Sequence, residues 1–151
     1  MKNTVILTVI VFIVAIASCS NSKHTTTSSS GTTAITDENK LNGNWQLTSI
    51  IDAKIAFDVL FPNKKPTLVF KLPSANISGN GGCNGYGGEV KIEGSNINFS
   101  KIMHTMMACD GINGENQFFK TLESATAYRV DADTNLILLK AGVSVMQFVK
   151  K

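Results

Sequence analysis

The chain has few of the residues that most often carry catalysis or bind charged partners. Its 151 residues include 2 histidines, 3 cysteines and 1 tryptophan, and its formal net charge is only +3. So mild and scattered a positive charge argues against an electrostatic nucleic-acid surface, and we expect no nucleic-acid partner. His104 is the only histidine after His24, and no G-x-S-x-G motif accompanies it. A serine–histidine hydrolase is therefore not indicated, and we predict that the protein is not an enzyme.

The chain also lacks an apolar run as long as the about 20 residues that cross a membrane. Residues 5–17 are apolar except for Thr8, which suits the apolar region of about 7–15 residues in a signal peptide. Small residues then precede Cys19, and this end resembles the lipobox of bacterial lipoproteins. The resemblance implies a lipoprotein signal peptide over residues 1–18, with cleavage before Cys19 and lipidation of its thiol. A secreted protein in which Cys19 is incidental is the alternative.

Residues 20–36 are dominated by serine and threonine and cannot bury enough apolar surface to fold alone. We interpret residues 19–40 as the lipidated cysteine followed by a flexible tether. Several acyl chains on Cys19 would hold the protein stably at a membrane, which is its first expected partner. Because Ser20 follows the cysteine, lipoprotein sorting rules favour the outer membrane, facing the periplasm.

Residues 41–151 form the expected folded domain. Alternating apolar and polar residues predict short strands near 45–50, 67–72, 76–79, 86–92, 97–99, 103–107, 127–130, 136–139 and 143–149, with a further extended stretch at 54–60. Turns are predicted at 93–96, 131–135 and 141–142.

One helix is expected within this domain, capped by Asn113 and with Glu115 in its first turn. Phe118, Phe119 and Leu122 recur there at helical spacing. We therefore predict a mainly β (α+β) fold: a small antiparallel β-barrel-like domain of about eight strands with one helix. An open β-sandwich is the alternative.

Residues 79–88 hold six glycines around Cys83. Asn84 stands where a G-x-G-x-x-G fingerprint needs its third glycine, no Gly-Lys-Ser/Thr follows, and the next residues read as a strand. The loop therefore lacks the helix N-terminus of a phosphate site. Glycine here is expected to provide positive-φ turns and close backbone approach, presenting Cys83 and Tyr86 inward.

With Cys19 lipidated, Cys83 and Cys109 remain, and two cysteines in an exported domain predict a disulfide. Neither lies in a C-x-x-C motif, so a redox or metal pair is the weaker reading. Residues 103–109 carry methionine, histidine and cysteine, which suit Cu(I). Strand alternation would divide them between two faces, and methionine often fills gaps in cores. We expect no cofactor and no metal.

Four motifs in this order resemble the META domain of the HslJ-like family, across nearly all of residues 41–151. They comprise Gly43, Trp45 and Leu47; Gly79, Asn80, Gly81, Gly82, Cys83, Asn84, Tyr86 and Gly88; Thr105, Met107, Ala108 and Cys109; and Glu115, Phe118 and Leu122. The resemblance implies a small β-barrel-like fold with one helix, in exported bacterial proteins that are often lipoproteins linked to heat response and antibiotic tolerance. It implies no catalytic residue.

These observations predict a lipid-anchored, non-enzymatic protein of the bacterial cell envelope. Its expected role is to bind or stabilise an envelope protein or lipid under stress or antibiotic exposure. The alternatives are a small-molecule or lipid carrier that uses a barrel crevice, and a copper-handling periplasmic protein.

Overall fold

The computed structural model describes residues 37–51, 54–109 and 114–151, which belong to one compact unit. The expected signal peptide, Cys19 and most of the expected tether lie outside these residues. The first described element begins at Asp37, earlier than the expected domain start at Leu41. The elements in chain order are α1 (Asp37–Leu41), β1 (Gly43–Ile50), α2 (Phe57–Leu60), β2 (Thr67–Lys71), the 3-10 turn η1 (Leu72–Ser74), β3 (Asn76–Asn80), β4 (Gly85–Glu93), β5 (Asn96–His104), α3 (Glu115–Ser124), β6 (Ala127–Asp131), β7 (Asn135–Lys140) and β8 (Val143–Lys150).

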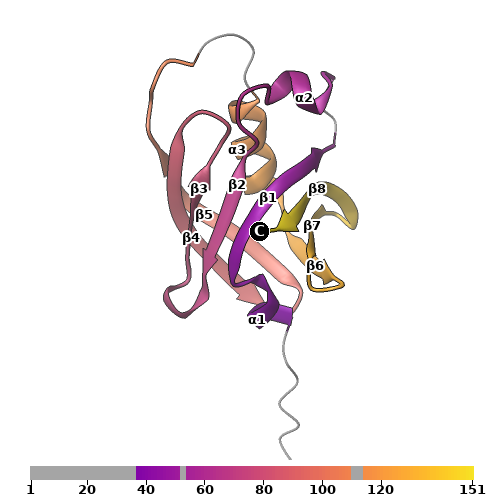
Figure 1. Cartoon of the computed structure of the whole chain (residues 1–151). Coiled ribbons are helices and arrows are strands. Elements are labelled where there is room, and N and C mark those ends of the chain that lie inside the picture. The colour runs from indigo at the N-terminus through magenta and orange to yellow at the C-terminus, as the bar shows by residue number, and fades with distance from the viewer. Residues whose placement is uncertain (1–36, 52–53, 110–113) are drawn as a thin grey trace, which may run out of the picture. The chain divides into compact units, whose positions relative to one another are not determined.

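The eight strands form one closed antiparallel barrel in which each strand pairs with its neighbours in the sequence (Figure 1). Strand β8 returns to β1, where Leu47 lies opposite Phe148, and this pairing closes the ring. The prediction of a mainly β, barrel-like domain with eight strands is confirmed. The alternative of an open β-sandwich is wrong, because the ring leaves no pair of separate sheets.

Side-chain alternation and turn residues account for most of the strands. In β1, Trp45 and Leu47 are buried while their neighbours are more exposed. Gly94, with φ of 61°, turns the chain between β4 and β5, and positive-φ residues likewise occupy the β6–β7 and β7–β8 turns. The three predicted turns are confirmed. Turn residues such as glycine, aspartate and asparagine thus mark where these strands end.

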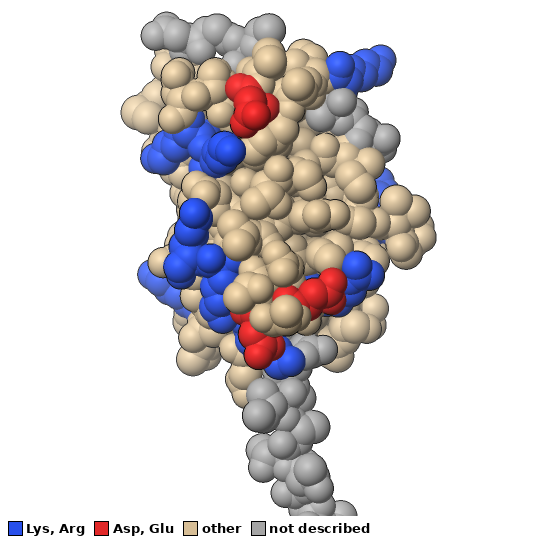
Figure 2. Space-filling view, turned by 45° about the vertical axis from the view of Figure 1, so that its right-hand side comes forward, with Lys and Arg blue, Asp and Glu red and all other residues tan. Residues whose placement is uncertain are grey.

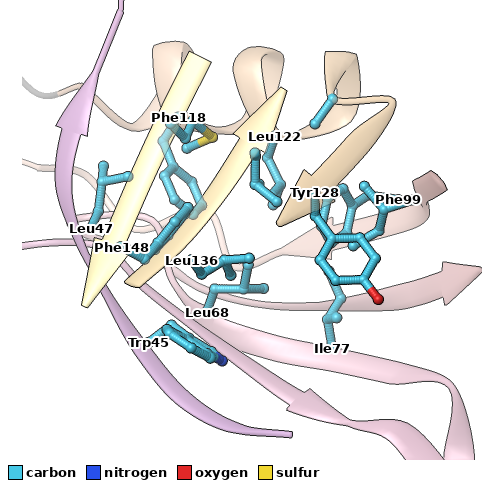
Figure 3. Close-up of a cluster of buried hydrophobic side chains, with 14 of the residues drawn as sticks. Trp45, Leu47, Leu68, Ile77, Phe99, Phe118, Leu122, Tyr128, Leu136 and Phe148 are labelled. Carbon is cyan, nitrogen blue, oxygen red and sulfur yellow. The ribbon is translucent and has the colours of Figure 1, made fainter. Parts of the chain in front are cut away.

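Apolar side chains fill the interior of the barrel (Figure 3). Trp45, Leu68, Leu136 and Phe148 are almost completely buried there. The indole Nε1 of Trp45 donates a hydrogen bond of 2.6 Å to the carbonyl oxygen of Leu41, which satisfies the one polar atom of that ring. Trp45 is therefore a core residue, and this packed interior does not favour the carrier alternative.

Helix α3 connects β5 to β6, the two neighbouring strands with the fewest register pairs. Those two strands share a single register pair, Asn96 with Ala127. On the inner face of the helix, Phe118 and Leu122 are fully buried in the core. The predicted helix is confirmed, although its expected cap, Asn113, lies outside the described residues.

The extended stretch expected at residues 54–60 is wrong, because residues Phe57–Leu60 form the short helix α2. Ile55 and Val59, which a strand pattern would place on one inner face with Phe57, are each more than a third exposed. The residues that reach the core are instead Leu60 and Phe61. In a strand, these two adjacent residues would point to opposite faces.

The strand expected over residues 103–107 is only partly present, since β5 ends at His104. The side chains of Met103, Met106 and Met107 are exposed to 76%, 91% and 61%, respectively. Their interpretation as core gap-fillers is wrong. Among the methionines that the structure describes, only Met146 is buried in the core.

Charged side chains of both signs border a broad area without charge on the face shown in Figure 2. Ion pairs such as Lys91 with Glu93 and Lys101 with Glu89 lie at the surface. Within the described residues, no helix is both long and apolar enough to span a bilayer.

Candidate functional site

The glycine-rich loop between β3 and β4 is a tightly hydrogen-bonded corner, here called the glycine corner (residues 79–85). The side-chain oxygen of Asn80 accepts from the backbone N–H of Gly82 at 2.8 Å, and its amide donates to the carbonyl of Cys83 at 2.9 Å. The N–H of Gly81 donates to the carbonyl of Asn84 at 2.9 Å. Backbone groups that could have faced a phosphate are thus used to close the turn.

Glycine is required in this corner for two different reasons. Gly82 has a φ of 114°, a conformation that side chains disfavour. Gly79 lies so close to β2 that a Cβ atom would overlap the backbone carbonyl of Thr67. These are the two roles that the sequence predicted for the glycines.

Asn84 is the centre of a buried polar network. Its backbone N–H donates to Oε1 of Glu115 at 2.6 Å, and its side-chain Nδ2 donates to Oε2 of the same carboxyl at 2.7 Å. Its Oδ1 accepts from the hydroxyl of Thr105 and from the N–H of Met107, both at 2.8 Å. One asparagine therefore joins the glycine corner, the segment after β5 and the first turn of α3.

From the sequence, Glu115 was predicted as a favourable charge in the first turn of the helix and as a residue of the fourth family-like motif. The structure places it on the buried face of α3, with 7% of its surface exposed. The sequence did carry a signal of this placement, because Glu115, Phe118, Phe119 and Leu122 follow the i, i+3, i+4, i+7 spacing of one helix face. An acidic residue on an apolar stripe calls for a buried hydrogen-bond partner, and Asn84 is that partner.

Cys83 and Cys109 lie at disulfide-bonding distance, with Cα atoms 6.2 Å apart. That separation is within the range that a disulfide spans. The bridge would tie the glycine corner to the chain just after Met107, beside the Asn84 network. The expected pairing of these two cysteines is therefore supported by their positions.

Residues 103–107, here called the methionine segment, run along the rim of the barrel at the end opposite α1 (Figure 1). The N–H of Thr105 donates to the carbonyl of Gly85 at 3.0 Å, which extends the pairing of β4 and β5 by one residue. His104 is exposed, and its ring stacks on that of Phe119 at 4.7 Å between centroids and 13° between planes. The segment is thus held by its backbone while its methionine side chains face solvent.

Tyr86 is buried beneath the glycine corner, as the sequence predicted. Its hydroxyl donates to the carbonyl of Thr67 at 2.9 Å, and its ring packs edge-on against Phe119. Burial strongly raises the pKa of the Tyr86 phenol, so the group stays protonated. It acts as a hydrogen-bond donor that fixes β2 against β4.

The residues of the four family-like motifs divide between two places. The first motif lies on β1, where Trp45 and Leu47 enter the core, and Phe118 and Leu122 of the last motif also belong to the core. From the two middle motifs, Asn84, Thr105 and Met107 form the Asn84 network together with Glu115, whereas Tyr86 belongs to the core. This arrangement can hold the glycine corner rigid. The polar groups of Asn84 and Glu115 bind each other and do not point toward a common ligand.

The comparisons with known proteins agree with this architecture. A family model described as the META domain matches residues 37–151. An NMR structure of a protein from Burkholderia xenovorans is similar, with 20% identity, a TM-score of 0.58, and coverage of 76% of this chain and 86% of that one. A crystal structure of a DUF4847 family protein from Bacteroides vulgatus is also similar, with 17% identity, a TM-score of 0.55, and coverage of 76% of this chain and 96% of that one. At these identities the two structures establish the fold alone. No curated protein sequence matches the chain.

Proposed function

Because this chain belongs to the META domain family and carries the lipobox-like Cys19, we propose that it is a lipid-anchored, non-enzymatic protein of the bacterial cell envelope. In this proposal it sits at the outer membrane, facing the periplasm. It binds or stabilises an envelope protein or lipid and so raises tolerance to heat or antibiotics.

The observation that best supports a non-enzymatic role is that the polar groups of the Asn84 network bind one another. Both carboxyl oxygens of Glu115 accept from Asn84, and the side chain of Asn84 also binds Thr105 and Met107. A catalytic acid or base needs a hydrogen bond to its substrate at some step, whereas these groups are engaged with one another. Their arrangement favours a protein that acts through its surface.

Two further observations support export and surface action. Cys83 and Cys109 lie at disulfide-bonding distance, and such bridges persist in oxidising compartments outside the cytosol. The interior is occupied by side chains such as Trp45 and Phe148, which leaves the outer face as the natural place for a partner. A compact barrel on a tether can reach partners at a distance from the membrane while it remains anchored.

Fractionation of cells that express the full chain tests the anchor. The parent protein should sediment with membranes and incorporate radiolabelled palmitate, whereas Cys19→Ser should lose the label and appear in the soluble fraction. Val143→Ser, an exposed change far from Cys19 in sequence, is a control that should behave like the parent. Membrane attachment or labelling of the Cys19→Ser protein equal to that of the parent would refute the anchor.

A second experiment tests the role in stress. A strain that lacks the gene should survive heat shock or envelope-directed antibiotics less well, and the parent gene should restore survival. Restoration by Cys19→Ser to the full parental level would show that anchoring is not needed. Equal survival of the deleted and parent strains under both stresses would refute the stress role.

A further inference from the structure

A shallow groove lies on the outer face of the barrel, over the part of β4 that follows the glycine corner. Its volume is about 680 Å³, and Ser78, Gly87 and Met103 are among the residues that line it. In the strand register, Gly87 pairs with Ser78 of β3 on one side and with Met103 of β5 on the other. These residues therefore form one row across three adjacent strands (Figure 1). Because Gly87 has no side chain, the backbone of β4 forms the floor of the groove there.

A second groove, of about 390 Å³, lies over the other half of β4. Asn76, Glu89 and Ser100 are among its lining residues. Glu89 pairs with Asn76 of β3 and with Ser100 of β5, so these residues form a second row across the same strands. Gly87 and Glu89 are two residues apart on β4 and therefore face the same side of the sheet. The two grooves adjoin along β4, and together they are here called the outer trough.

The fold does not require glycine at two positions of the outer trough, Gly85 and Gly87. Neither residue has a positive φ, and the nearest atom to an added Cβ would be 3.8 Å away at each position. By contrast, a Cβ atom on Gly88, at the register shift between β4 and β5, would lie 3.0 Å from the carbonyl oxygen of Ser100. Glycine inside a strand weakens it and often marks a bulge or a site where a ligand approaches closely. Gly88 accounts for the irregular pairing, so we attribute Gly85 and Gly87 to the approach of a ligand.

The charged side chains at the outer trough are paired with opposite charges. Oε1 of Glu89 lies 2.9 Å from Nζ of Lys101. Lys91, which also lines the trough, has its Nζ 2.7 Å from Oε1 of Glu93. These pairs leave no excess positive charge for a phosphate or a nucleic acid, whose affinity depends on lysine and arginine. An uncharged ligand therefore suits the trough best.

Two other uncharged occupants fit less well. A peptide that adds a strand to a sheet needs an exposed edge, whereas β4 is paired with β3 on one side and with β5 on the other. An acyl chain would cover the amides of Asn76 and Asn98 and the hydroxyl of Ser100, which line half of the trough. Covering polar groups without replacing their hydrogen bonds to water costs free energy. The ligand should therefore carry hydrogen-bonding groups of its own.

We propose that the outer trough binds a neutral oligosaccharide. The hydroxyl groups of a sugar both donate and accept hydrogen bonds, as do the amides of Asn76 and Asn98 and the hydroxyl of Ser100. The C–H groups on the face of a sugar ring are apolar, and they match the bare backbone at Gly87 and the exposed side chain of Met103. The proposal rests on action through the protein surface and not on the lipid anchor, so the two can fail separately.

Titration followed by NMR tests this site in the full chain with Cys19→Ser, which cannot be lipidated at that position. The probes are three neutral oligosaccharides, chitotetraose, cellotetraose and maltotetraose, each added to about 10 mM so that millimolar dissociation constants are detected. With at least one of them, the backbone amides of Gly87 and Glu89 should shift. The side-chain amides of Asn76 and Asn98 should shift in the same titration.

Substitutions then separate the outer trough from general surface binding. Gly87→Val fills the floor of the trough with a residue that suits a strand, and Asn76→Ala with Asn98→Ala removes two amides without filling it. Each change should weaken binding by about tenfold or more, while circular dichroism checks that the variant is folded. Gln147→Val is the matched control, because Gln147 is exposed on β8, which is not adjacent to β3, β4 or β5 in the ring. Its affinity should equal that of the parent.

Unshifted trough amides with all three oligosaccharides would overturn the proposal. So would equal affinity in the parent, in Gly87→Val and in the double alanine variant, or a loss in Gln147→Val as large as that in Gly87→Val. Lysophosphatidylcholine and a hexapeptide of serine and glycine are further probes. If one of these shifts the same amides and no oligosaccharide does, the trough binds a lipid or a peptide and the proposal is wrong.

Discussion

Asn84 matters because the hydrogen bonds of its backbone and side chain serve three separate parts of the chain. It is 3% exposed and binds Glu115, Thr105 and Met107. A buried polar network of this kind stabilises a fold only when its members are paired, since an unpaired buried donor or acceptor costs free energy. The stability of the glycine corner and of the segments bound to Asn84 should therefore depend on the chemical identity of these groups as well as on their size.

Glu115→Gln tests this dependence with almost no change in shape. Glu115 offers two acceptors to the two N–H donors of Asn84, whereas glutamine offers one acceptor and one NH₂ group. One donor of Asn84 would then face another donor, and the free energy of unfolding should fall by about 1–3 kcal/mol. Urea unfolding followed by circular dichroism measures the change.

Glu123→Gln is the matched control, because Glu123 lies on the same helix and is exposed. Its effect should stay within about 0.5 kcal/mol. If the Glu115 and Glu123 variants are equally stable, the Asn84 network contributes nothing specific to the fold.

Gly79 and Gly85 allow a comparable test of the glycine corner. A Cβ atom on Gly79 would overlap the carbonyl of Thr67, whereas on Gly85 the nearest atom, the carbonyl oxygen of Gly79, is 3.8 Å away. Gly79→Ala must therefore push β3 away from β2 and should cost about 1–3 kcal/mol. Gly85→Ala should change stability by no more than about 0.5 kcal/mol. Thermal unfolding of both variants checks this, and equal melting temperatures would contradict the steric explanation.

At the scale of elements, strands were predictable where burial alternates and turns carry glycine or asparagine. The hairpins around Gly94 and Gly142 follow from local chemistry alone. Helix α2 could not be predicted from the spacing of its apolar residues. It is a single turn, and its apolar residues alternate with other residues as they would in a strand. Helix α2 also makes a tertiary contact that its local sequence does not show: the carbonyl of Leu60 accepts from the N–H of Gly114 at 2.9 Å, next to α3. The partner of Glu115 was hidden for a similar reason, since Asn84 lies 31 residues away in the chain.

A bridge between Cys83 and Cys109 would join the glycine corner to the chain that follows β5. The cysteines are 26 residues apart. A disulfide that closes a loop of that size lowers the entropy of the unfolded chain, which should raise the free energy of unfolding by about 2–4 kcal/mol. Reduction, or Cys83→Ser with Cys109→Ser, should lower the free energy of unfolding by that amount in urea titrations. Cys19→Ser should have no such effect, because it leaves this loop closed.

Thiol counting checks the bridge itself in the Cys19→Ser background. The denatured, unreduced protein should give no thiol reactive toward a maleimide label, and two after reduction. Two reactive thiols before reduction would contradict the bridge.

At the scale of the whole molecule, the barrel is closed, but the number of register pairs between neighbouring strands differs around the ring. At the junction of β5 and β6 the register contains one pair, Asn96 with Ala127. Hydrogen bonds at this junction run from the N–H of Ile97 to Thr126 and from the N–H of Tyr128 to Ser95, at 3.1 and 2.9 Å. By contrast, β7 and β8 pair along their whole length, from Asn135 to Lys140. Helix α3 packs Leu122 into the same part of the core as Phe99 and Tyr128 (Figure 3).

This difference predicts where the ring opens first. Local opening of a short junction breaks few hydrogen bonds and exposes little apolar surface, so it should occur at a lower free energy than global unfolding. In native-state hydrogen exchange, the amides of Ile97 and Tyr128 should exchange faster than those in the middle of β7, such as Leu136 and Leu138. Low concentrations of urea should accelerate Leu136 and Leu138 steeply, because their exchange needs global unfolding, and should hardly affect Ile97 and Tyr128. If all four amides exchange at one rate with one urea dependence, the barrel opens as a single unit and the junction is not its weak point.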